Sequence, residues 1–152
     1  MQRITSFEVD HTKIVEGVYI SRIDGDITTF DMRTRKPNCG DYMDNITMHT
    51  FEHMFATFVR NSEISADVIY FGPMGCQTGF YLLVRNANNL QIINIIRDIL
   101  GKIINHTGEV FGASEIECGN YRSLDLLSAQ AEARRYLEKI KNIREQDLTY
   151  PV

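Results

Sequence analysis

We expect the fold to be organised around the stretch HTFEH, residues His49–His53. It lies inside a helical pattern that runs from about Ile46 to Arg60, in which apolar residues recur three and four positions apart. Asp44 or Asn45 comes just before the pattern and is suited to cap its first turn. The sequence therefore predicts that this motif is carried on an amphipathic helix.

On such a helix, His49 and His53 are four positions apart and lie on one face. Side chains at this spacing have Cβ atoms about 5–6 Å apart, which lets two imidazoles share one metal ion. Glu52 flanks the same face and can move a proton without being a ligand. The plainer interpretation is a helix with two packed or surface histidines and a solvated glutamate. We favour the metal site because the chain has 4 histidines and two of them fall in this one turn.

Composition limits the classes of partner that we expect. The chain has 152 residues, which fits a single domain spanning 1–152, and a formal net charge of −4. That charge argues against nucleic acid as a partner, because such proteins present a basic face. The longest apolar run, Leu90–Ile104, is interrupted by charged and amide side chains, so we expect no membrane partner.

Cysteine usage and the first ten residues predict a compartment. The N-terminal residues are charged and include no apolar signal segment, which predicts a cytoplasmic protein. The 3 cysteines are an odd number and widely spaced, so metal binding or chemistry is favoured over disulfides.

The rest of the pattern predicts an α+β fold, with a mainly antiparallel sheet packed against helices. Asp24-Gly25 lies between two strand-like runs and indicates a hairpin turn. We expect a frayed tail at 148–152, where little can anchor the chain. The expected elements are strands at 15–23, 27–32, 66–71 and 80–84, loops at 33–42 and 72–79, and helices at 46–60, 89–105 and 124–143.

Two helical histidines make only part of a metal site, since a catalytic site has three protein ligands and one open position. Spacing does not choose the third ligand. A free surface thiol is the plainer fate for Cys39, and a helix-terminal cation is the plainer fate for His106. The candidates are Cys39, Cys76, Cys118, His11, His106 or a carboxylate.

Five motifs in collinear order resemble the S-ribosylhomocysteine lyase (LuxS) family over nearly the whole chain. They are SFEVDH at 6–11, FDMR at 30–33, HTFEH at 49–53, GPMGCQTG at 72–79 and ECGNY at 117–121. Five ordered motifs in a chain of family-typical length are far more specific than any one of them.

The resemblance implies a role for particular residues. His49, His53 and Cys118 match the family's metal ligands, for one divalent ion per subunit, with Fe(II) favoured and zinc or cobalt able to substitute. Glu52 and Cys76 match its acid–base pair. Positions that line the family's substrate pocket are matched by Ser6, His11 and Arg33.

The resemblance also implies an activity and an assembly. The family cleaves S-ribosylhomocysteine to homocysteine and 4,5-dihydroxy-2,3-pentanedione, the precursor of the quorum-sensing signal autoinducer-2, as a step of the activated methyl cycle. It forms homodimers whose active sites lie at the subunit interface. Two positions depart from the family pattern: Leu124 replaces a histidine found in many members, and Tyr70 precedes the glycine-rich loop where others carry an acidic residue. Both departures concern substrate anchoring and leave the ligands and the acid–base pair unchanged.

Chemistry and two alternatives complete the expectations. Moving a carbonyl along a sugar and then expelling a thiolate is aided by a Lewis-acidic divalent ion and by groups that both take and give protons. One alternative is a metallopeptidase of the inverted His-x-x-Glu-His type, which would leave Cys76 without a role. The other is a non-enzymatic module with a structural zinc, which would need a fourth protein ligand.

Overall fold

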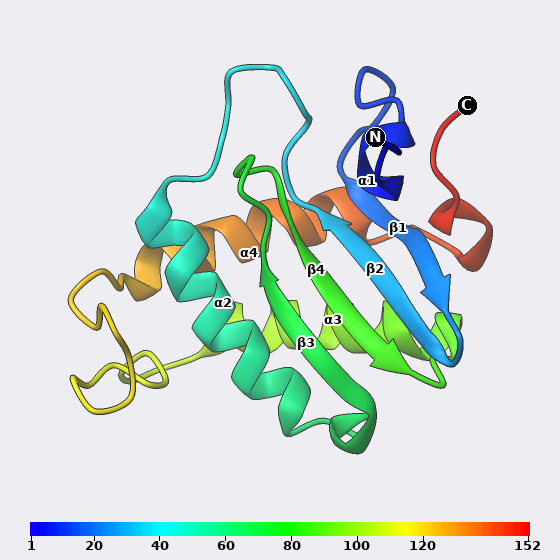
Figure 1. Cartoon of the computed structure of the whole chain (residues 1–152). Coiled ribbons are helices and arrows are strands. Elements are labelled where there is room, and N and C mark those ends of the chain that lie inside the picture. The colour runs from blue at the N-terminus through cyan, green and yellow to red at the C-terminus, as the bar shows by residue number, and fades with distance from the viewer.

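A four-stranded antiparallel sheet forms the frame of the molecule in the computed structural model, which describes all residues from Met1 to Val152 (Figure 1). Its strands are β1 (Gly17–Asp24), β2 (Ile27–Arg33), β3 (Val68–Pro73) and β4 (Gly79–Arg85), in the order β1-β2-β4-β3. Asp24 pairs with Ile27 across the predicted hairpin turn, where Gly25 has a φ of 61°. Glycine adopts such a positive φ without steric cost. The antiparallel α+β fold predicted from the sequence is therefore confirmed.

Three long helices pack against this sheet, and each begins at a polar cap. They are α2 (Asn45–Arg60), α3 (Asn89–Asn105) and α4 (Leu126–Ile140), and their caps are Asp44, Asn88 and Asp125. In each case the cap side chain accepts a hydrogen bond from a backbone N–H of the first turn, which would otherwise have no partner. In Figure 1, α3 and α4 lie behind the sheet and α2 runs alongside β3. None of the helices combines the length and apolar character that a membrane crossing requires.

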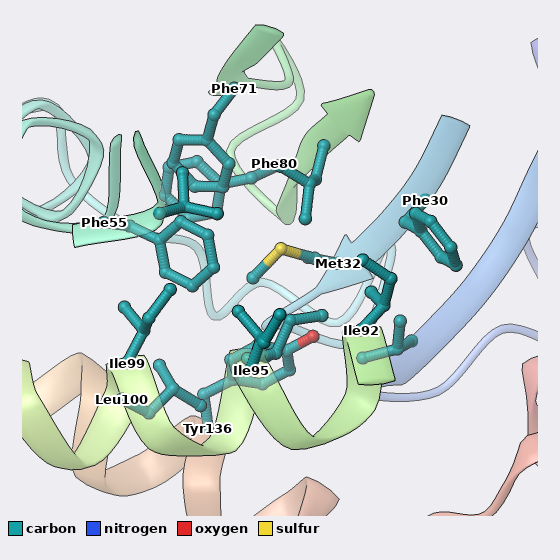
Figure 2. Packing of buried hydrophobic residues seen from close by; sticks show 14 of the residues in the cluster. Phe30, Met32, Phe55, Phe71, Phe80, Ile92, Ile95, Ile99, Leu100 and Tyr136 are labelled. Carbon is teal, nitrogen blue, oxygen red and sulfur yellow. The ribbon is translucent and has the colours of Figure 1, made fainter. Parts of the chain in front are cut away.

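The core lies between the sheet and the helices and fixes how α2 is rotated. Phe51 and Phe55 on α2 stack against Phe71 and Phe80 of the sheet, with ring centroids 4.7 Å apart for Phe51–Phe80 and 4.4 Å for Phe55–Phe71. Figure 2 shows Phe55, Phe71 and Phe80 above the labelled isoleucines of α3. Aromatic pairs contribute roughly 0.5–1.5 kcal/mol each beyond their buried area. Because both phenylalanines point inward, the histidines of the same helix are turned away from the sheet.

Several boundaries differ from those predicted. The last helix was expected over 124–143 but spans only Leu126–Ile140. It starts at Leu126 because Asp125 caps its first turn. Strand β3 continues through Pro73 and β4 starts at Gly79, so the glycine-rich loop is shorter than expected. A short helix α1 (Thr5–Glu8) and the 3-10 turns η1 (Ser65–Asp67) and η2 (Glu145–Leu148) were not predicted.

The prediction of a frayed C-terminal tail is wrong. Leu148 is buried with 2% of its surface exposed, and the Tyr150 hydroxyl donates to Asp31 Oδ2 at 2.7 Å. The Tyr150 ring also stacks on Tyr19 of β1, with ring centroids 4.9 Å apart. The tail is therefore held against the outer face of the sheet.

Candidate metal centre

The long loop between α3 and α4 brings a cysteine to the two helical histidines. Ligand atoms of His49, His53 and Cys118 all lie within 4.8 Å of one another, and Cys118 Sγ is 3.4 Å from His49 Nε2. The third-ligand position that spacing left open is thus occupied in space by Cys118. Cys39 remains an exposed free thiol, and His106 is the C-cap of α3, as the plainer interpretations of both residues expected.

Two backbone carbonyls of the same loop orient the imidazoles. His49 Nδ1 lies 2.8 Å from the carbonyl oxygen of Ser123, and His53 Nδ1 lies 2.8 Å from that of Phe111. A carbonyl only accepts, so each Nδ1 carries the proton and each Nε2 keeps its lone pair for a ligand bond. This second layer was not predicted, because any residue can offer a backbone carbonyl.

Gly112 allows the loop to pass close to His53. Its φ is +68°, and a Cβ built at this position would lie 3.2 Å from His53 Nδ1. Both the positive φ and the close approach favour glycine. The position therefore couples the backbone of the loop to the orientation of one imidazole.

Polar side chains fasten the two ends of the loop. At its start, the Gln130 amide donates to the carbonyls of Ile103, Ile104 and His106. At its end, the backbone N–H of Asp125 donates to Thr50 Oγ1 at 2.8 Å, inside the histidine motif. The Asn120 N–H also lies 3.4 Å from Cys118 Sγ and donates to it, which helps to fix the position of the sulfur.

The donor set fits a divalent metal ion. Two neutral imidazoles and one thiolate suit zinc, iron or cobalt, and they cancel only part of the ion's charge. No fourth His, Cys, Asp or Glu joins the three ligand atoms, as a closed structural zinc site would need. Glu52 is half-buried on the same helix and stands outside the ligand group. The arrangement can therefore bind an ion and keep one coordination position for a small molecule.

The remaining predicted residues gather around a second cavity. Cys76 is exposed on the loop between β3 and β4, and its Sγ lies 2.9 Å from Thr78 Oγ1. A cavity of about 330 Å³ is lined by Cys76 together with Ser6, His11 and Arg33. The hollow of about 290 Å³ that Cys118 lines shares no residue with it. Within one chain, the structure thus groups the predicted site residues into two sets.

Arg33 is the buried charge of the second set. It forms a salt bridge with Asp31, with Nη2 at 2.6 Å from Oδ2 and Nε at 3.1 Å from Oδ1. Burial works to lower the pKa of Arg33, but the charge of Asp31 and the hydrogen bonds to it outweigh burial and raise that pKa above its usual value. The guanidinium therefore stays charged as one half of a buried ion pair beside the cavity.

Comparison with known proteins agrees with this geometry. The family model of S-ribosylhomocysteinase (LuxS) matches residues 4–147. The chain belongs to the LuxS family. It is 45% identical to the S-ribosylhomocysteine lyase of Desulfotalea psychrophila over 158 aligned residues, which cover 99% of each chain. It is also 43% identical to that of Borreliella afzelii and 42% identical to that of Finegoldia magna, over 99% of this chain and 99–100% of theirs.

The two departures from the LuxS pattern take distinct places in the structure. Leu124 directly precedes Asp125, the cap of α4, and so lies at the end of the long loop between α3 and α4. Tyr70 is exposed on β3, and its ring occupies the space beside Gly72, where a Cβ would lie 2.0 Å from the tyrosine hydroxyl. Gly72 and Tyr70 are therefore packed as a pair, and neither departure displaces a candidate ligand.

Proposed function

We propose that this chain is a lyase that cleaves S-ribosylhomocysteine to homocysteine and 4,5-dihydroxy-2,3-pentanedione, with residues 1–152 acting as one catalytic domain. The observation that carries the proposal is the cluster of His49, His53 and Cys118, which has three ligand groups and no fourth and is found in a LuxS chain. Relatives that are 40–45% identical over 99% of this chain bear the name S-ribosylhomocysteine lyase.

The chain's own residues divide the chemistry between them. Each stage removes a proton beside a carbonyl, and the last stage expels the homocysteine thiolate by breaking a carbon–sulfur bond. When bound, the divalent ion supplies Lewis acidity that stabilises the resulting negative charge. Glu52, three positions from His49, takes and returns protons on the metal side, and Cys76 does so from the other side. Ser6, His11 and Arg33 hold the sugar and amino-acid parts of the substrate around Cys76.

We propose Fe(II) as the resident ion, one per subunit, and the cytoplasm as the compartment. A His₂Cys donor set accepts Fe(II), zinc and cobalt, and the preference for iron follows the family resemblance. All three cysteines are free thiols, a state that a reducing compartment maintains. Metal analysis of protein purified without oxygen tests the first assignment.

We propose a homodimer in which Cys76 of one chain faces the metal ligands of the other. Support comes from the separation of the two cavities and from exposed apolar side chains. Phe7 lines the cavity of Cys76, and Ile4 and Tyr70 line a neighbouring cavity that shares Ser6 and Tyr81 with it. Apolar groups left exposed around a functional cavity are suited to burial in an interface.

Mixing two inactive variants tests this arrangement. C76A and C118A homodimers should each be inactive, whereas refolding them together should restore about a quarter of the wild-type activity. Half of the mixed dimers pair one chain of each kind, and in those dimers one of the two sites has both an intact ligand set and an intact thiol. No recovery in a mixture shown to contain heterodimers would place both sets of residues in the same chain.

The three cysteines allow a compact test of the function itself. Thiol release from S-ribosylhomocysteine is measured beside metal content. We expect C118A to lose metal and turnover, C76A to lose turnover but keep metal, and C39A to keep both, since Cys39 is exposed and hydrogen-bonds only to the Lys36 carbonyl. Release of peptides from a library without thiol release would instead support the metallopeptidase alternative.

A further inference from the structure

A continuous chain of hydrogen bonds joins the C-terminal tail to the Cys76 thiol. The Tyr150 hydroxyl donates to Asp31 Oδ2 at 2.7 Å, and Asp31 is held at both oxygens by Arg33. Arg33 Nη1 then donates to Thr78 Oγ1 at 2.8 Å, and Thr78 Oγ1 lies 2.9 Å from Cys76 Sγ. Asp31 lies on β2 and Cys76 lies on the loop between β3 and β4, so this series of hydrogen bonds depends on the fold and not on local sequence alone.

The direction of these hydrogen bonds follows from the chemistry of the groups. A guanidinium has donors only, so the Thr78 hydroxyl must accept from Arg33. Its single proton is then free to point at Cys76, and an ionised Cys76 has no proton of its own, so its sulfur can only accept. A hydrogen bond that a thiolate accepts is stronger than one that a thiol accepts. Thr78 therefore stabilises the ionised, proton-accepting form of Cys76 and fixes where its sulfur lies.

All three inner members of this chain are buried. Asp31, Arg33 and Thr78 expose 0%, 2% and 2% of their surfaces. A buried carboxylate is costly unless its oxygens are paired, and Tyr150 adds a third donor to the two that Arg33 provides. Burial, then the charge of Asp31 and the hydrogen bond to it, raise the pKa of Tyr150, so the phenol keeps its proton and remains the donor.

We propose that Thr78 is a positioning residue for the Cys76 thiol, and that the tail residue Tyr150 maintains it through Asp31 and Arg33. The role of Cys76 in carrying a proton during catalysis rests on the lyase function proposed above. Other ionisable groups that line the cavities around the thiol are His11, Tyr42 and Tyr81, and none of them is hydrogen-bonded to the sulfur.

Alkylation of Cys76 by iodoacetamide tests the role of Thr78 without any substrate. Peptide mapping by mass spectrometry follows Cys76 separately from the other two cysteines. We expect T78V to slow alkylation at neutral pH about tenfold and to shift its pH profile upward, because one hydrogen bond to the charged form is lost. T78S should restore the rate to within about twofold, since it keeps the hydroxyl. The matched control is T28V, because Thr28 is another buried threonine of the same sheet and pairs with Val84, near the end of β4 that is farther from Cys76.

A comparison of two tyrosines tests the role of the tail. We expect Y150F to slow Cys76 alkylation about threefold, whereas Y136F should lower the melting temperature and leave alkylation unchanged. Tyr136 also donates a buried hydrogen bond, to the Gly17 carbonyl at 2.7 Å, but its hydroxyl makes no hydrogen bond to the side chain of Asp31 or Arg33. Wild-type alkylation in T78V, or equal slowing in T78S and T78V, would overturn the proposal for Thr78. Wild-type alkylation in Y150F would overturn the proposal for the tail.

Turnover separates this inference from the function on which it rests. If the lyase function holds, kcat on S-ribosylhomocysteine should fall in T78V in proportion to alkylation while KM stays within about twofold. If alkylation slows in T78V but the wild-type protein releases no homocysteine, the lyase function is rejected and the positioning role of Thr78 stands. If alkylation is unchanged in T78V and the wild-type protein turns over normally, the positioning role is rejected and the lyase function stands.

Discussion

Replacing Gly112 by alanine should weaken metal binding as well as the fold. Gly112 has a φ of +68°, and the new Cβ would lie 3.2 Å from His53 Nδ1. The left-handed backbone costs a non-glycine residue roughly 1–2 kcal/mol of stability. At that separation the ring or the loop must also move by a few tenths of an ångström. His53 cannot move freely, because its Nδ1 is hydrogen-bonded to the Phe111 carbonyl at 2.8 Å.

The expected loss in metal affinity follows from that displaced hydrogen bond. Removing an outer partner of a metal-bound histidine typically lowers affinity by about 10–100-fold. We therefore expect G112A to bind zinc or cobalt at least about tenfold more weakly than the wild-type chain. Competition with a chelating dye measures the affinity, and urea unfolding of the metal-free chain measures the stability.

Gly108 provides the matched control. It lies in the same loop with a φ of +101°, but no heavy atom lies within 4 Å of the position where its Cβ would be. G108A should lose a similar roughly 1–2 kcal/mol of stability and keep its metal affinity. Wild-type affinity in G112A, or an equal loss in G108A, would refute the claim that Gly112 acts through His53.

Three further predictions concern a proton carrier, a buried hydroxyl and high pH. E52Q should keep its metal and fold but lose turnover, since Glu52 has no side-chain hydrogen bond to lose; metal analysis with thiol release checks this, and normal turnover would point to another base. Y136F should lose about 1–3 kcal/mol in urea unfolding, because the Gly17 carbonyl is left unpaired; an unchanged midpoint would contradict this. Burial raises the pKa of Tyr136 well above 10.0, so as pH rises past 10.0 the unfolded chain loses a proton that the folded chain keeps. Stability should then fall by up to about 1.4 kcal/mol per pH unit, and Y136F should show the shallower decline.

The sequence predicted those parts of the site that local patterns determine. Helix α2 follows from its apolar periodicity, and the inward phenylalanines Phe51 and Phe55 settle which face carries the histidines. Spacing alone left the third ligand open. Cys118 was singled out by family resemblance, because it sits in an irregular loop whose path depends on contacts with distant residues such as Thr50. The carbonyls of Phe111 and Ser123 carry no sequence signal of any kind.

The C-terminal tail was mispredicted as frayed, although the sequence holds one feature that bears on it, the charged pair of the FDMR motif. Asp31 lies between Phe30 and Met32, whose side chains face the core, so the alternation of a strand places the aspartate on the opposite face of the sheet. Asp31 and Arg33 are both buried, and a buried ion pair needs a donor for every remaining oxygen lone pair and a surface that excludes water. Tyr150 provides both, through its hydroxyl and its stacked ring. The acid and base of the FDMR motif therefore need a covering segment, and in this fold the C-terminal tail supplies it.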